Sequence, residues 1–308
     1  MELDARTLDR LAGVAVGSAA GDAFGMPLEF TSPRPPERLV TGMIAGRLPA
    51  GSFTDDTEMA LALAESLLAQ RPLNPADLAA RFAAWYRTSP PDVGIHTAQV
   101  LGQVARGVPW ETASRGVWQA YPDNAGNGSV MRCWPAALAF WRDPAQLAAA
   151  SMLQSQVTHY HPECVAGSVL VNEIILRLVQ GNDPAQAVEG ATAAHSLPEG
   201  LRQAVISAPT RQRGELKNSG WVRHTLESAV WGLLTTSSFE GAVVQVANLG
   251  NDADTAAAVV GAMAGAYYGL EAIPAVWRSQ LSGEWPIRSG RRFGEPDFIR
   301  LAHSLAGG

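Results

Sequence analysis

Apolar residues recur along most of the chain with the three- and four-residue spacing of an amphipathic or buried α-helix. This spacing predicts a first group of helices over 9–25, 55–68, 75–88 and 96–106. It predicts further helices over 144–155, 163–180, 184–194, 198–208, 221–236, 239–246, 256–270 and about 296–306.

Between these segments the chain shows no long alternating run rich in β-branched residues, so no strand is predicted. Segments 31–50 and 211–221 are rich in Pro, Gly or polar residues and predict loops. No change of composition marks a domain boundary. We therefore expect an all-α fold, with residues 1–308 forming one compact multi-helix domain.

Two of the predicted helices carry glycine at every fourth position. The first has it at 13, 17, 21 and 25, and the second at 261, 265 and 269. Glycine inside a helix costs about 1 kcal/mol relative to alanine. Each row of glycines therefore indicates that another backbone packs close to the helix. The two rows could pack against each other or against a third helix.

Composition and charge limit the possible functions. The chain has 308 residues, of which 47% are hydrophobic, and a formal net charge of −6 without a basic block. This charge argues against a nucleic-acid-binding surface. Two cysteines cannot form a disulfide framework, and the first six residues lack the apolar core of a signal peptide. The 256–270 segment is too rich in Gly and Ala for a membrane span. We expect a cytoplasmic, soluble monomer.

Two helix starts carry more acidic residues than helix capping requires. An N-cap needs one side-chain oxygen, and the helix dipole favours a nearby acid by roughly 0.3–1 kcal/mol. Either start alone is explained by capping. If the two met, the repulsion between their carboxylates would need compensation by protonation or by cations, and such oxygen donors suit Mg²⁺ or Mn²⁺ better than Ca²⁺. The spacing does not show that they meet. The two starts are Thr54-Asp55-Asp56 and Asp252-Ala253-Asp254-Thr255.

Three weaker signals accompany these acids. Glu29 follows a helix that Pro27 should end, and it could be an ordinary loop residue. The small residues of 126–129 could approach a phosphate or sugar, or form a simple turn. His159, His161 and Cys164 suggest zinc, but no second half of such a site is found.

Taken in order, these motifs resemble those of the ADP-ribosylglycohydrolase family over nearly the whole chain. Asn251 stands where that family commonly has glycine, and Ser129 where it often has another small residue. The matching motifs are Gly21-Asp22-Ala23-Phe24-Gly25 with Glu29, Thr54-Asp55-Asp56, Asp92-Val93-Gly94, Gly126-Asn127-Gly128-Ser129 with Met131-Arg132, Thr158-His159, Ser219-Gly220 and Gly250-Asn251-Asp252-Ala253-Asp254-Thr255.

The resemblance implies an all-α fold with a binuclear site for two Mg²⁺ or Mn²⁺ ions. One half of the metal shell would be Thr54, Asp55 and Asp56, and the other half Asp252, Asp254 and Thr255. Glu29 would be a mobile acid over the site, and Asp92 would lie beside the distal ribose. The groove for ADP-ribose would be lined by Gly126, Asn127, Gly128, Ser129, Met131 and His159.

The implied activity is hydrolysis of the glycosidic bond between ADP-ribose and an acceptor, for which arginine is the first choice. Water would attack the anomeric carbon C1″, with Asp55, Asp56 or Glu29 as its base. The partner would be an ADP-ribose-modified protein or an ADP-ribosyl small molecule. Three alternatives stay open: a serine-, nucleic-acid- or small-molecule-linked substrate, a non-catalytic ADP-ribose-binding or structural relative, and two helical domains without a metal site.

Overall fold

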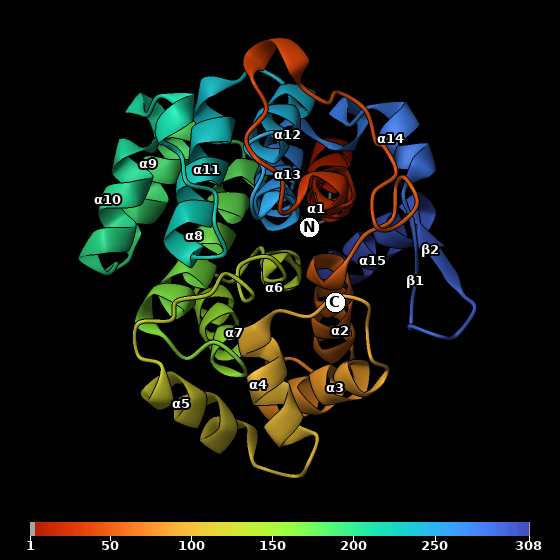
Figure 1. The fold of residues 1–308 in the computed structure, drawn as a ribbon, viewed down its shortest axis with the longest axis vertical. Helices are drawn as coiled ribbons and strands as arrows, with labels where there is room; N and C mark the ends of the chain where they lie inside the picture. Colours follow the sequence, from red (N-terminus) through yellow and green to blue (C-terminus); the bar gives the residue numbers. More distant parts are fainter. Residues whose placement is uncertain (1–3, 308) are drawn as a thin grey trace.

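The computed structural model describes residues 4–307, which fold into helices and one short hairpin (Figure 1). The first seven helices are α1 (Ala5–Gly25), α2 (Asp55–Ala69), α3 (Pro75–Arg87), α4 (Ile95–Val104), α5 (Trp110–Ala120), α6 (Trp134–Ala139) and α7 (Pro144–Gln156). They are followed by α8 (Pro162–Val179), α9 (Pro184–Ala194), α10 (Glu199–Ser207), α11 (Val222–Thr235), α12 (Phe239–Ala247), α13 (Ala253–Tyr268), α14 (Ala275–Gln280) and α15 (Glu295–Gly307). Strands β1 (Ser282–Glu284) and β2 (Arg292–Gly294) form the antiparallel hairpin.

Helices α1 and α13 pack with their backbones in direct contact, and this confirms the prediction from the two glycine rows. A Cβ atom on Gly17 would lie 2.4 Å from the carbonyl oxygen of Gly261. A Cβ atom on Gly21 would lie 2.0 Å from the carbonyl oxygen of Ala257. Since real Cβ atoms do not approach a carbonyl so closely, only glycine permits this helix spacing at both positions.

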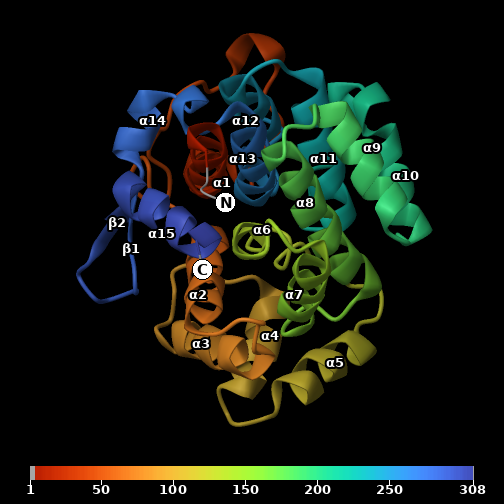
Figure 2. The same ribbon diagram turned by 180° about the vertical axis from the view of Figure 1, so that it is seen from behind.

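The contact between α1 and α13 brings together two segments that are far apart in the sequence. In both ribbon views α1 lies beside α13, with α12 and α11 next to α13 and α15 crossing near α1 (Figures 1 and 2). Helices α2 to α7 form the other half of the molecule. The first residues of α2 and α13 therefore reach the boundary between the two halves.

Helix α1 is a core helix. The segment Ala5–Leu28 is long and apolar enough to cross a membrane, but 94% of its most apolar window is buried inside the protein. The helix begins four residues before the predicted start at residue 9. Asp4 explains the earlier start, because its side chain accepts a hydrogen bond from the backbone N–H of Thr7.

The structure corrects several predictions made from the hydrophobic pattern. The expectation that the chain has no strands is wrong, because Ser282 pairs with Gly294 and Glu284 with Arg292. Three-residue strands are too short to show an alternating pattern. Gly283 faces the ring of Phe53, which a side chain at this position would strike. Helices α5, α6 and α14 were also not predicted.

Candidate active site

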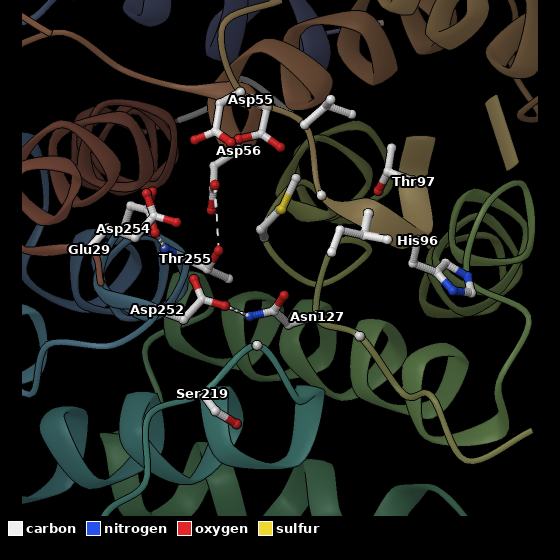
Figure 3. Close-up of a pocket in the computed structure, with 18 of the residues that line it drawn as sticks. Glu29, Asp55, Asp56, His96, Thr97, Asn127, Ser219, Asp252, Asp254 and Thr255 are labelled. Atoms are coloured by element: carbon white, nitrogen blue, oxygen red, sulfur yellow. Dashed lines mark hydrogen bonds between the residues drawn. The ribbon is translucent and has the colours of Figure 1, made fainter. Parts of the chain in front are cut away.

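A cavity of about 810 Å³ lies where the first turns of α2 and α13 meet (Figure 3). Carboxylates gather on one side, and small residues and histidines form the other. The lining residues are Glu29, Phe30, Asp55, Asp56, Asp92, Val93, Gly94, Ile95, His96, Thr97, Asn124, Gly126, Asn127, Gly128, Met131, His159, Ser219, Gly220, Asn251, Asp252, Asp254 and Thr255.

The start of α2 is held by a carboxylate from another helix. Thr54 occupies the N-cap position, but its hydroxyl donates to Asp22 of α1 at 2.8 Å and does not cap the helix as expected. Asp22 also accepts hydrogen bonds from the backbone N–H groups of Thr54 and Thr57, at 2.9 and 3.2 Å, and from the Thr57 hydroxyl at 2.6 Å. Because Asp22 replaces the local cap, neither Asp55 nor Asp56 is needed to cap α2.

The start of α13 follows a turn with left-handed backbone at Gly250 and Asn251, whose φ angles are 65° and 53°. A Cβ atom on Gly250 would lie 2.3 Å from the Thr31 carbonyl oxygen, so this position requires glycine. Asn251 departs from the family pattern, but asparagine tolerates left-handed backbone better than most residues. The turn directs the acidic start of α13 toward α2.

The two acidic helix starts do meet. The Thr255 hydroxyl lies 3.5 Å from Asp56 Oδ2, and Asn127 Nδ2 donates to Asp252 Oδ2 at 2.8 Å (Figure 3). Asp254 Oδ1 accepts from the backbone N–H of Thr255 at 2.9 Å. The structure thus answers the question that the spacing left open, since residues about two hundred positions apart share one wall of the cavity.

Burial and mutual repulsion dominate the electrostatics of this wall. Burial, followed by repulsion from neighbouring carboxylates, raises the pKa of Asp55, Asp56 and Asp254 well above the usual range. Burial likewise raises the pKa of Asp22 to about 6. Asp56 Oδ1 is buried and has no hydrogen-bond partner within residues 4–307. A free carboxylate oxygen among buried, mutually repelling acids fits a cation-binding site.

A second group of carboxylates lies at the same wall and holds a side chain that was not predicted. One oxygen each of Glu29, Asp92 and Asp254 lie within 4.8 Å of one another. The guanidinium of Arg47 is hydrogen bonded to Glu29 and Asp92, and it lies 3.6 Å from Asp254. This second group therefore already contains one positive charge, supplied by the loop before α2.

Most of the predicted groove residues line the cavity, but Ser129 does not. Its side chain is fully buried, and its hydroxyl contacts the hydroxyls of Ser155 at 3.0 Å and Ser168 at 3.2 Å. The prediction that Ser129 lines the groove is therefore wrong. Its neighbours Gly126, Asn127 and Gly128, together with Met131 and His159, do line it. Thr54 is also absent from the lining, and its hydroxyl oxygen lies 2.8 Å from Asp22 Oδ1 and 3.5 Å from Asp56 Oδ2.

Several lining or supporting residues were missed. Asp22, His96 and Ser219 belong to, or adjoin, motifs quoted for the resemblance, so a signal for them existed in the sequence. Arg47 comes from an irregular loop without any pattern that could have identified it. The suggested zinc cluster does not form: Cys164 Sγ contacts the Gly126 carbonyl oxygen, and His161 caps α8.

Comparisons with known proteins agree with this geometry. The family model described as ADP-ribosylglycohydrolase matches residues 3–307. An ADP-ribosylarginine hydrolase from Serratia proteamaculans is 34% identical, with 90% of this chain and 76% of that protein covered. An ADP-ribosyl-[dinitrogen reductase] glycohydrolase from Rhodospirillum rubrum is 33% identical, with coverage of 89% and 90%. A solved structure titled ADP-ribosylglycohydrolase-related protein complex superposes with a TM-score of 0.82 at 31% identity, over 98% of both chains.

Proposed function

The chain belongs to the ADP-ribosylglycohydrolase family, and from this membership we propose that it hydrolyses the bond between ADP-ribose and an acceptor arginine. The observation that carries the proposal is the meeting of the α2 and α13 starts, which places buried carboxylates at one wall of a cavity of about 810 Å³. Such a wall suits a reaction in which positive charge develops on a sugar ring.

We further propose that this wall holds two Mg²⁺ or Mn²⁺ ions. The orphaned Asp56 Oδ1 and the raised pKa values of its neighbours support a cation there. Bound divalent ions would neutralise the carboxylates and polarise hydroxyl and water oxygens of the reacting groups. The residues that would hold them are Thr54, Asp55 and Asp56 on one side and Asp252, Asp254 and Thr255 on the other.

The opposite wall would bind the ADP-ribosyl group. Gly126 and Gly128 keep the backbone open to a close approach, and Met131 adds an apolar contact beside them. Asn127 Nδ2 is fixed by two acceptors, Thr225 Oγ1 and Asp252 Oδ2, each at 2.8 Å. This amide ties the binding wall to the acidic wall, so a ligand held by one is oriented toward the other.

Arginine as the acceptor is supported by a contact within the chain. Glu29 and Asp92 hydrogen bond to the guanidinium of Arg47, so this part of the cavity already accommodates the group that an acceptor arginine carries. Burial raises the pKa of Glu29, which brings it nearer to the pH at which a carboxylate serves as a general base. Glu29, Asp55 or Asp56 would take the proton from the attacking water.

The proposal is tested with ADP-ribose linked to arginine, to serine and to nucleic acid, each offered with Mg²⁺ and with Mn²⁺. Released ADP-ribose is measured by mass spectrometry, and bound metal by elemental analysis. We expect metal-dependent release from the arginine conjugate. The Asp56→Ala, Asp254→Ala double variant should lose both metal and activity, whereas Asp183→Ala, at the N-cap of α9, should keep both.

Three outcomes would contradict the proposal. Full activity of the double variant would exclude the acidic wall from the reaction. Release only from the serine or nucleic-acid conjugate would show that the acceptor is serine or nucleic acid and not arginine. Tight binding of ADP-ribose without turnover of any conjugate would indicate a binding protein.

A further inference from the structure

Two histidines form a stacked pair on the wall of the cavity opposite the acids. His96 lies in the first turn of α4, and His159 follows α7. Their ring centroids are 4.6 Å apart and both residues line the cavity. Figure 3 shows His96 on the side away from Glu29 and Asp254. His96 has no role in the proposed reaction, and the reaction does not determine which ring nitrogen of His159 carries the proton.

One residue, Thr158, contacts both rings. Its carbonyl oxygen lies 3.0 Å from His96 Nε2, and its hydroxyl oxygen lies 2.8 Å from His159 Nδ1. The same hydroxyl accepts a hydrogen bond of 2.7 Å from Nη2 of Arg132. Thr158 and Arg132 are both fully buried. The four residues therefore form one chain of contacts that reaches from the core to the cavity wall.

Counting protons along this chain assigns the tautomer of His159. A guanidinium can only donate, so the Thr158 hydroxyl is the acceptor of the bond from Arg132. The single hydroxyl proton then has His159 Nδ1 as its acceptor. If Nδ1 carried a proton itself, the hydroxyl proton would be buried without a partner, which is costly. The proton of a neutral His159 therefore belongs on Nε2.

The polar edge of the His159 ring faces the glycine loop. A Cβ atom on Gly128 would lie 2.7 Å from His159 Cε1 and 2.9 Å from Nε2, so glycine is needed for the ring to take this position. No hydrogen bond within residues 4–307 uses Nε2 of His159. Since both residues line the cavity, this N–H is available to a bound ligand.

Burial, His96 and Arg132 together keep His159 uncharged. The guanidinium of Arg132 has no carboxylate partner within the described chain, and bonds instead to the Gln154 side chain at 3.2 Å and the Gln154 carbonyl oxygen at 3.0 Å. It also lies over the Phe82 ring, 4.4 Å from the centroid. Burial, with repulsion from His96 and from this cation, lowers the pKa of His159 well below its usual range. The ring therefore stays neutral at physiological pH.

We infer that Arg132 and Thr158 are positioning residues, which hold His159 in its neutral Nε2–H form so that the cavity presents a fixed N–H donor to an oxygen of the ADP-ribosyl group. The inference rests on the proposed function for the identity of the ligand. A neutral donor adds no positive charge near the acidic wall, where the proposed metal ions would bind.

The test replaces the hydroxyl of Thr158. Thr158→Val removes the hydroxyl at nearly constant shape, and Thr158→Ser keeps it. Long-range ¹⁵N NMR spectra of the histidine rings report the tautomer, with the His159 signals identified by their loss in His159→Gln. Calorimetry measures the Kd for ADP-ribose, and steady-state kinetics separate KM from kcat. Thr192→Val, which removes a hydroxyl bonded to Val188 inside α9, is the control.

We expect Thr158→Val to show a population of the Nδ1–H form of His159. Its Kd for ADP-ribose and its KM should both rise about tenfold, with kcat changed by about twofold or less. Thr158→Ser should restore the tautomer and most of the affinity. Thr192→Val should behave as wild type in all three measurements.

Three results would overturn the inference. The first is an unchanged tautomer in Thr158→Val, and the second is a changed tautomer without loss of ADP-ribose affinity. The third is an equal loss in Thr158→Ser and Thr158→Val together with a lowered Tm, which would show a purely structural role. Failure of the proposed function is distinguishable, because the wild-type protein would then release no ADP-ribose from any conjugate, while its NMR spectrum still reported the tautomer.

Discussion

The two walls of the cavity bury charges of opposite sign and stabilise them in different ways. The acidic wall gathers Asp55, Asp56 and Asp254, whose pKa values are raised by burial and repulsion. The histidine wall is formed by His96 and His159, which both contact Thr158. Behind it lies Arg132, a buried cation that donates hydrogen bonds to neutral oxygens of Gln154 and Thr158. The proposed metal ions would bring cations to the acidic wall from outside the chain, whereas the histidine wall has its buried cation within the chain.

This difference separates what each wall can contribute. A wall that binds the proposed metal ions would respond to the metal supply and to pH. A wall that holds its own cation keeps one hydrogen-bonding pattern under most conditions. Substitutions in the two walls should accordingly differ in how they affect metal binding, stability and ligand affinity.

The largest effect should come from removing one carboxylate from the acidic wall. Asp56→Asn keeps the shape of the side chain but removes a negative charge and a strong metal ligand. We expect kcat/KM to fall by at least about 10³-fold, or about 4 kcal/mol. The metal-free protein should nevertheless become more stable, because repulsion among buried acids is relieved. Activity assays, metal titration and thermal melts with a chelator measure the three effects.

Asp183→Asn provides the matched control, since Asp183 accepts a hydrogen bond from Gln186 N at the start of α9. There the substitution should leave metal binding and activity unchanged and should not raise stability. If Asp56→Asn destabilised the metal-free protein as well, the acidic wall would not be under repulsion, and the contrast between the walls would be lost.

The next effect tests whether the acidic wall depends on the contact between α1 and α13. Gly21→Ala would place a Cβ atom 2.0 Å from the Ala257 carbonyl oxygen, so the helices must move apart. We expect a loss of about 3 kcal/mol in the free energy of unfolding, measured with urea, together with weaker metal binding. ADP-ribose affinity should change less, because the histidine wall is built on other helices.

The control for this prediction is Gly116→Ala in α5, where a Cβ atom would meet nothing within 4 Å. It should stabilise the protein by about 0.5–1 kcal/mol, since alanine is the better helix former. Equal stability of Gly21→Ala and wild type would mean that the close packing of the glycines is not required.

The sequence predicted the acidic wall better than the histidine wall. The glycine rows predicted that each helix packs against another backbone, and the acids at two helix starts, together with the family resemblance, predicted a metal-binding role for Asp56 and Asp254. Both signals are local patterns that a single segment displays. Their meeting needed the structure, because spacing along the chain does not fix which helix ends approach each other.

The histidine wall was harder to predict from the sequence, because it is held together by contacts between residues far apart in the chain. Arg132 bonds to Gln154 and Thr158, which lie 22 and 26 positions further along the chain. No periodicity marks such a chain of side chains. Ser129 was misplaced for the same reason: a small polar residue beside glycines fits a ligand loop, but its partners Ser155 and Ser168 turn it into the core.

The response to pH gives a third test, because Glu58, a buried acid in the same helix as Asp55 and Asp56, and His159 of the histidine wall should respond in opposite directions. Glu58 in α2 accepts a bond from Trp85 Nε1, and burial raises its pKa from 4.5 to about 7. The folded protein therefore binds this proton more tightly, and the stabilisation is lost as the pH rises through about 7. The shift corresponds to about 3 kcal/mol. His159, with its lowered pKa, should instead cost stability as the pH falls below about 6.5.

Urea titrations of the metal-free protein between about pH 5 and about pH 8 measure this response. Glu58→Gln should lose less stability than wild type as the pH rises, by up to about 3 kcal/mol at the upper end. The exposed Glu240→Gln in the first turn of α12 should follow the wild-type curve. Identical pH curves for Glu58→Gln and wild type would show that Glu58 is ionised in both folded and unfolded protein.

The smallest effect should come from Arg47, the cation that the chain itself offers to the acidic wall. Because its guanidinium pairs with Glu29 and Asp92 and lies 3.6 Å from Asp254, it competes with an external cation for the same carboxylates. Its side chain is one-third exposed, so each ion pair contributes up to about 1 kcal/mol. We expect Arg47→Gln to strengthen Mn²⁺ binding about three- to tenfold at low salt, with a smaller gain at high salt.

Arg211→Gln, which removes an ion pair with Glu227 outside the cavity lining, should leave Mn²⁺ affinity unchanged. Weaker Mn²⁺ binding by Arg47→Gln would show that Arg47 supports the metal-bound arrangement of the acids and does not compete with the metal.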